Sequence, residues 1–231
     1  MISYQAIILS GGKGTRVKKY TKKIPKCLIR FNNKPFLYYQ LKYLKENNIK
    51  NVIISVCYLS KQIKHYVDNN IDFINVKIVD EKKPLGTGGA TINSLKFLDK
   101  NFYIIYGDSY LNFSLKKLNN RNNLATMAIY KNNNNYDISN IEIKSSNKII
   151  YHAEKKNLKL NYIDYGVSIV NKNIFVGVKK KIKFDLSRFF EKFSKQGKLY
   201  KCVINKRFYE IGSYNGIKDF KDFLNRYEIY R

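Results

Sequence analysis

The chain has 231 residues and carries 44 Lys and Arg against 17 Asp and Glu, a formal net charge of +27. Its 44% hydrophobic and 15% aromatic residues are enough for a buried core, which excludes a disordered basic tail and favours about one domain. Three widely spaced cysteines and uniformly short apolar runs argue against disulfides, a structural zinc site, export or a membrane span, which favours a cytoplasmic location.

The first half of the chain alternates predicted strands with predicted helices. Strands are expected over residues 4–9, 51–57, 73–79 and 102–106, and helices after Pro35, over 59–67 and over 89–98. The helix that opens at Pro35 has an apolar face formed by Leu37, Leu41 and Leu44. This alternation predicts an α/β fold, a doubly wound and mainly parallel sheet with helices on both faces.

The second half of the chain is less regular. Its predicted strands span residues 125–130, 141–143, 149–152, 167–170 and 208–211, and its predicted helices span 185–196 and 215–227. Asp185 is expected to cap the first of these helices at its N-terminus. The sequence contains no repeat of the kind that builds a solenoid.

The first predicted strand ends in the turn Leu9-Ser10-Gly11-Gly12-Lys13-Gly14-Thr15-Arg16. Glycines let the backbone approach a ligand and aim several N–H groups at one anion, while Lys13 and Arg16 add positive charge. A phosphate is therefore the expected ligand. The turn fits neither common phosphate template, because Val17 replaces the third glycine of the dinucleotide fingerprint and the P-loop Gly-Lys-Ser/Thr is missing. A tight turn with incidental basic residues is the alternative.

This turn, followed by Lys26 in the run IPKCL, resembles the signature of the sugar-1-phosphate nucleotidyltransferases. Further motifs that resemble those of the family follow in the same order: PLGTGGA at 84–90, YGDS at 106–109, Glu154-Lys155, IDYG at 163–166 and FYEIG at 208–212. The form of the PLGTGGA loop is similar to that of heptose-1-phosphate and mannose-1-phosphate guanylyltransferases. Together the motifs span residues 9 to 212.

The resemblance implies a Rossmann-like mixed sheet with ligands beyond the carboxyl ends of its strands. It implies a single domain over residues 1–231, with a nucleotide-binding half of about 1–115. The other half, about 116–231, would bind the sugar, complete the metal site and carry a small β flap. In the implied reaction a phosphate oxygen of the sugar phosphate attacks the α-phosphorus of a nucleoside triphosphate, and pyrophosphate leaves. That nucleophile is already an anion, so no activating serine, cysteine or histidine is needed.

The resemblance also assigns residues to the reaction. It implies Mg²⁺ as the cofactor, held by Asp108 and Glu210, although Glu210 stands where much of the family has Asp. The implied catalytic residues are Arg16, Lys26 and Asp108. The implied nucleotide-binding residues are Leu9, Gly11, Gly12, Gly14, Thr15, Arg16, Glu81, Gly86, Thr87 and Gly88. The implied contacts to the sugar phosphate are Asn140, Glu154, Lys155, Tyr165 and Gly166.

Several alternatives stay open on the sequence alone. Asp108 and Glu210 could cap turns, and Lys26 and Glu154 could be ordinary surface charges. GTP with a heptose or mannose 1-phosphate is the first hypothesis, and a cytidylyltransferase using CTP on a sugar or non-sugar phosphate or phosphonate is the second. The charge of +27 prompts a nucleic-acid-binding hypothesis, but lysines occur in every region and no nucleic-acid motif gathers them. The expected partners are thus an NTP and a sugar 1-phosphate, and a homodimer is compatible with the sequence.

Overall fold

The computed structural model describes residues 4–119, 123–154, 159–179 and 182–227. The helices are α1 (Lys18–Thr21), α2 (Phe36–Glu46), α3 (Ser60–Asn70), α4 (Gly86–Ser94), α5 (Leu186–Lys195) and α6 (Tyr214–Tyr227). The longer strands are β1 (Gln5–Ser10), β4 (Asn51–Val56), β5 (Asn75–Asp80), β6 (Asn101–Tyr106), β8 (Ala125–Lys131), β11 (Tyr162–Asn171) and β12 (Leu199–Ile204). The short strands are β2 (Arg30–Phe31), β3 (Lys34–Pro35), β7 (Ser109–Tyr110), β9 (Ile141–Ile143), β10 (Ile149–Tyr151) and β13 (Tyr209–Glu210).

In the described part of the chain, nine strands form one mixed sheet in the order β10-β9-β11-β6-β1-β4-β5, with β8 and β12 branching from β11. Strands β6, β1, β4 and β5 run parallel to one another, and Ile8 of β1 lies between Ile54 and Ile105. Ile7 and Ile8 are both fully buried although they point to opposite faces. Burial on both faces explains why β1 reads as a continuous apolar run, and it confirms the predicted α/β sheet.

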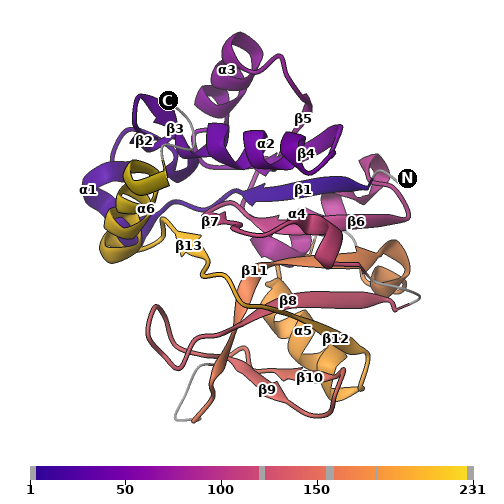
Figure 1. Cartoon of the computed structure of the whole chain (residues 1–231). Coiled ribbons are helices and arrows are strands. Elements are labelled where there is room, and N and C mark those ends of the chain that lie inside the picture. The colour runs from indigo at the N-terminus through magenta and orange to yellow at the C-terminus, as the bar shows by residue number, and fades with distance from the viewer. Residues whose placement is uncertain (1–3, 120–122, 155–158, 180–181, 228–231) are drawn as a thin grey trace.

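Strand β11 joins the second half of the chain to this sheet. It is antiparallel to β6 and also pairs with β8, and β12 runs parallel to β8 (Figure 1). The strands that we expected as a small flap therefore continue the main sheet through β11. The pairing of β11 with β8 shifts register between Asp164 and Ser168, and Gly166 has a φ of +94° there. A bulge of this kind bends a strand and changes the direction of its side chains.

Helix α4 starts earlier than the sequence predicts. The expected helix over 89–98 is a helix over Gly86–Ser94 followed by a 3₁₀ turn over Leu95–Phe97. Glycine is a poor helix former, so the glycines of the first turn hid the start. The N–H groups of Gly88 and Gly89 are satisfied from outside the helix, because both donate to the carbonyl oxygen of Phe184. Tertiary contact therefore overrides the local propensity.

An aromatic cluster anchors helix α6. The Phe220 ring is fully buried and lies 4.9 Å from Phe31, 5.1 Å from Phe36 and 5.0 Å from Tyr110, between ring centroids. Figure 1 shows α6, in yellow, beside α1 at the indigo start of the chain, and Tyr214 contacts this segment. Helix α6 is thereby held against α1. Within the described residues, we find no helix long and apolar enough for a bilayer.

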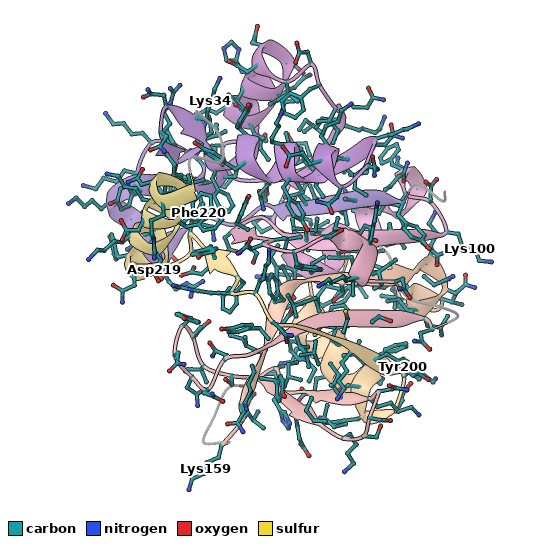
Figure 2. All side chains as sticks on the ribbon, in the orientation of Figure 1. Lys34, Lys100, Lys159, Tyr200, Asp219 and Phe220 are labelled. Atoms are coloured by element: carbon teal, nitrogen blue, oxygen red, sulfur yellow. The ribbon has the colours of Figure 1, made fainter. Side chains whose placement is uncertain are left out.

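The excess positive charge is spread around the molecule. Figure 2 shows Lys34, Lys100 and Lys159 on three different sides, with basic side chains projecting from the periphery between them. A nucleic-acid site usually gathers its lysines and arginines on one face or stripe. The distribution therefore favours a solvated basic surface over a single nucleic-acid footprint.

Candidate active site

A first cavity of about 400 Å³ opens beyond the carboxyl ends of β1 and β6. Leu9, Gly11 and Gly12, which end or follow β1, form one wall, and residues of the loop from Glu81 to α4 form another. Gly107 brings β1 and β6 together here. Its N–H donates to the carbonyl oxygen of Leu9 at 3.1 Å, and a Cβ at Gly107 would lie 2.5 Å from the same oxygen. This close approach places the side chain of the next residue at the cavity.

A second cavity of about 240 Å³ lies beside the first. It is lined by Arg16, Asn140, Tyr165, Gly166 and Glu210, all residues that the sequence analysis singled out. The two cavities share two residues, Tyr106 and Asp108, at the end of β6. The structure therefore offers two adjoining binding spaces with one carboxylate at their junction.

Charged groups converge at this junction. Lys26 Nζ donates to Asp108 Oδ2 at 2.6 Å. A Cβ placed on Gly212 would lie 2.9 Å from Asp108 Oδ2, 2.9 Å from Glu210 Oε2 and 2.8 Å from Arg16 Nη2. Both carboxylates and the guanidinium thus surround one small space, which only a glycine leaves free. The YGDS and FYEIG motifs, about 100 residues apart in sequence, meet at this point.

Strand pairing explains why Glu210 reaches Asp108. In the β7–β13 pair, Glu210 stands opposite Ser109, and the Ile211 N–H donates to the Asp108 carbonyl at 3.0 Å. The Glu210 carboxylate itself accepts from the Gly212 N–H and from the Ser213 hydroxyl. Helix α6 leaves room for it, because a Cβ at Gly216 would overlap this carboxylate. The site is therefore built jointly by β7, β13 and the first turn of α6.

The two carboxylates differ in how readily they ionise. Burial alone would raise the pKa of Asp108, but the neighbouring Lys26 and Arg16 outweigh it and lower this pKa below its ordinary value. Burial raises the pKa of Glu210, and the negative charge of Asp108 adds to that effect. Asp108 is thus held as a carboxylate, and Glu210 ionises more readily once a cation faces it.

The donor set at the junction fits magnesium. Mg²⁺ takes oxygen ligands, commonly one or two carboxylates with phosphate oxygens and water at the other positions. Asp108 and Glu210 are two such carboxylates, and the described residues hold no group of three or more candidate ligands that would form an all-protein cage. The sequence-based assignment of both residues to one metal site stays a prediction that this geometry supports.

Glu81 is a buried carboxylate in the wall of the first cavity. It follows β5, and its two oxygens accept from the Ser55 hydroxyl at 2.9 Å and from the Leu85 N–H at 3.1 Å. Gly11 lies across from it, since a Cβ there would be 3.2 Å from Glu81 Oε1. Burial raises the pKa of Glu81, although both hydrogen bonds oppose this effect. The sequence placed Glu81 among the nucleotide-binding residues.

The glycines of the PLGTGGA loop make room for another part of the chain. Gly86 has a φ of +70°, and a Cβ there would lie 2.5 Å from the Phe184 carbonyl oxygen. A Cβ at Gly88 would overlap the Phe184 ring. Gly86 still lines the first cavity, whereas Gly88 lines neither. Both positions need glycine because residues 182–186 pass close to them. We call residues 182–186 the strap.

The strap and the loop cap each other's helices. Thr87 Oγ1 accepts from the Leu186 N–H at the start of α5, and the Thr87 N–H donates to Asp185 Oδ1. Asp185 occupies the expected N-cap position of α5, but its side chain makes no hydrogen bond to that helix. Its carboxylate instead serves α4. Asp185 is thus the N-cap residue of α5, as predicted, but its side chain bonds a helix far away in sequence.

Besides Gly88, three of the expected site residues that the structure describes are absent from the cavity walls. Gly14 has a φ of +65° and its carbonyl accepts from the Thr21 hydroxyl, so it shapes the turn toward α1. Thr15 lines neither cavity. Glu154 forms an exposed ion pair with Arg188 Nη2 at 2.6 Å and also lines neither cavity. Lys155 lies outside the described residues.

The structure adds residues that sequence reasoning missed. Asp164 and Tyr151 line the second cavity, and Asp164 sits inside the quoted IDYG motif, where only its neighbours were assigned. Tyr136 and Asp137 also line this cavity, and they directly follow the asparagine run at residues 132–135. Lys183 lines the first cavity, and it was hidden in a run of lysines that resembles ordinary surface.

Comparison with known proteins shows the family of the chain. Residues 5–226 match the family model described as nucleotidyl transferase. The chain is 35% identical over 208 residues to the D-glycero-alpha-D-manno-heptose 1-phosphate guanylyltransferase of Campylobacter jejuni, covering 90% of this chain and 94% of that protein. It is 33% identical to the enzyme of the same name from Aneurinibacillus thermoaerophilus, covering 90% and 93%.

A solved structure shares the fold. HddC from Yersinia pseudotuberculosis, crystallised with GMP-PN, superimposes with a TM-score of 0.77 at 26% identity, covering 96% of this chain and 99% of that one. The family match spans nearly the whole described chain and includes each of the elements that build the two cavities. The chain therefore belongs to the nucleotidyl transferase family.

Proposed function

We propose that this protein is a Mg²⁺-dependent guanylyltransferase that joins GTP to a sugar 1-phosphate of the heptose or mannose type and releases pyrophosphate. The observation that carries the proposal is the pair of adjoining cavities with Asp108 at their junction. The names of two relatives more than 30% identical to the chain support this choice of substrates. Because nucleoside triphosphates are used in the cytoplasm, the proposal includes that location.

In this proposal the first cavity holds the nucleotide and the second holds the sugar. The backbone of Gly11 and Gly12 faces the phosphates, and Lys26 and Arg16 flank the junction where two anions must meet. Fixed positive charge stabilises the charge that spreads over the transferring phosphoryl group. A bound Mg²⁺ at Asp108 and Glu210 would neutralise further phosphate charge. The attacking phosphate oxygen needs no base, in keeping with a junction that holds no histidine among its lining residues.

Glu81 supports the choice of GTP over CTP. A carboxylate only accepts hydrogen bonds, and guanine presents neighbouring N1–H and N2–H donors. Cytosine offers only its N4 amino group as a donor. A buried acceptor in the nucleotide cavity therefore favours guanine, with the fixed Ser55 and Leu85 contacts keeping it oriented.

The second cavity supports a polyhydroxylated acceptor. Asn140, Tyr151 and Asp164 supply donors and acceptors for hydroxyl groups. The Asp164 side chain is held by the Gly166 N–H at 2.8 Å. Contacts from Glu154 and Lys155 to the sugar phosphate stay part of the proposal, and Glu154 would have to exchange Arg188 for the sugar.

A substrate panel tests the proposal. Purified protein is incubated with each NTP and with mannose, heptose, glucose and N-acetylglucosamine 1-phosphates, and pyrophosphate release is measured. We expect release with GTP and a manno-configured acceptor, its loss when a chelator removes the metal, and its recovery with added Mg²⁺. Turnover with CTP and not GTP would favour the cytidylyltransferase hypothesis, and silence with every pair would refute the proposal.

The raised pKa of Glu81 predicts how GTP use depends on pH. As the pH falls through this pKa the carboxyl takes up a proton and can no longer accept both guanine donors. The KM for GTP should then rise by about tenfold, and should begin to rise at a higher pH than for an ordinary glutamate. Steady-state kinetics across the pH range measure this effect. In the Glu81→Gln variant the KM for GTP should not show this rise at low pH. Identical dependences of KM on pH in the two proteins would contradict the assignment of Glu81 to the guanine contact.

A further inference from the structure

The strap, residues 182–186, is fixed to the nucleotide-binding loop by its backbone. The Phe184 N–H donates to the Leu85 carbonyl at 3.0 Å, and the Phe184 carbonyl accepts from Gly88 at 3.0 Å and from Gly89 at 3.3 Å. The crosswise contacts of Thr87 with Asp185 and Leu186 extend this attachment. Hydrogen bonds along its length therefore hold the strap against the PLGTGGA loop.

This attachment puts Lys183 at the Glu81 end of the first cavity. Lys183 precedes Phe184, which bonds Leu85, and the Leu85 N–H in turn donates to Glu81 at 3.1 Å. Both Lys183 and Glu81 line the cavity. The other lysine of the lining, Lys26, is already paired with Asp108, where the first cavity adjoins the second.

Lys183 is available to a ligand. Its side chain is exposed and makes no hydrogen bond or ion pair with the residues that the structure describes. The ammonium group of Lys183 can thus donate hydrogen bonds, and the carboxylate of Glu81 can accept them, at the same end of the first cavity. Guanine carries a matching set of groups, because its O6 and N7 accept while its N1–H and N2–H donate. Lysine and arginine are the side chains that most often contact O6 and N7.

We propose that Lys183 is a specificity-determining residue that donates to O6 and N7 of guanine, while Glu81 accepts from the other edge of the base. This inference rests on the proposed use of GTP. It assigns the strap a direct part in choosing the nucleotide, and it gives the glycines of the PLGTGGA loop a reason: they let the strap approach closely enough to deliver its lysine.

Two GTP analogues separate the proposed contacts. In 6-thio-GTP sulfur replaces O6 as a weaker acceptor, and ITP lacks the N2 amino group. We expect Lys183→Met to lower kcat/KM for GTP by about 10- to 100-fold, mainly through KM, and to abolish the preference for GTP over 6-thio-GTP. The preference for GTP over ITP should persist in this variant. Lys183→Arg should keep most of the wild-type discrimination.

Lys179→Met is the matched control, because it removes the same charge from the same connection at a residue that does not line the cavity. It should behave like the wild type with all three nucleotides. If Lys183→Met lowered kcat/KM by the same factor with GTP and with 6-thio-GTP, the inference would be overturned, and the lysine would be assigned to the phosphates. Turnover of CTP but not of GTP by the wild-type enzyme would instead refute the proposed function. The experiment therefore distinguishes failure of the inference on Lys183 from failure of the proposed function.

Discussion

The Asp108→Asn variant is expected to lose at least about 10³-fold in nucleotidyl transfer while keeping its fold. Asp108 belongs to both cavities, and it lies within 2.9 Å of the space that Arg16 and Glu210 also face. An amide of the same shape cannot supply the negative charge that a divalent ion requires. It also removes the partner of Lys26, whose ammonium loses its 2.6 Å ion pair. Pyrophosphate release under saturating substrates measures the loss.

Circular dichroism spectra and thermal melts of this variant check that the fold persists. The matched control is Asp72→Asn, which removes one carboxylate from an exposed position outside both cavities. It should leave activity within about twofold of the wild type, because exposed substitutions change stability and binding little. More than a tenth of wild-type turnover in Asp108→Asn would remove this residue from the catalytic assignment.

Gly216→Ala is the second substitution with a large expected effect, about 10²-fold or more in activity. Alanine in a helix interior is ordinarily better than glycine by about 1 kcal/mol, so the change looks stabilising from sequence alone. In this fold the added methyl would occupy the position of the Glu210 carboxylate. Glu210 would have to leave Gly212 and Ser213, and with them its place beside Asp108.

Asn215→Ala provides the comparison, since it adds the same helix former one residue earlier, at an exposed position. Activity and melting temperature should be measured for both variants. We expect Asn215→Ala to keep full activity and Gly216→Ala to lose it without unfolding. A Gly216→Ala protein that is fully active and more stable would show that Glu210 does not need its present position.

Much of the fold could be predicted because its local and global signals agree. The apolar runs at β1, β4 and β6 are continuous since helices and neighbouring strands bury both faces, and this pattern is typical of a parallel sheet. The motifs of the site also lie at strand ends, where a parallel sheet brings them together. The family resemblance implied that Asp108 and Lys26 share one site, and the structure joins them although 82 residues separate them.

The parts that could not be predicted depend on contacts between distant segments. Strand β12 alternates weakly and is stabilised by its parallel partner β8, so its own residues gave little signal. Gly88 reads as space for a ligand, but the space is taken by Phe184, nearly 100 residues later. Asp185 is the N-cap residue of α5 as predicted, but its carboxylate accepts from Thr87, a contact that no local pattern indicates. Sequence patterns indicate contacts between residues that are close along the chain, whereas these contacts join residues that are far apart in sequence.

The shared wall of Tyr106 and Asp108 has a consequence for inhibitor design. Because the two cavities adjoin at these residues, a single bisubstrate compound carrying a guanosine and a sugar on one linked phosphate chain is expected to bind to both. Once one end is bound, the other end experiences a local effective concentration in the millimolar range, so its binding is in effect intramolecular. The NDP-sugar product has this same bridging form, and it would therefore compete with both substrates at once.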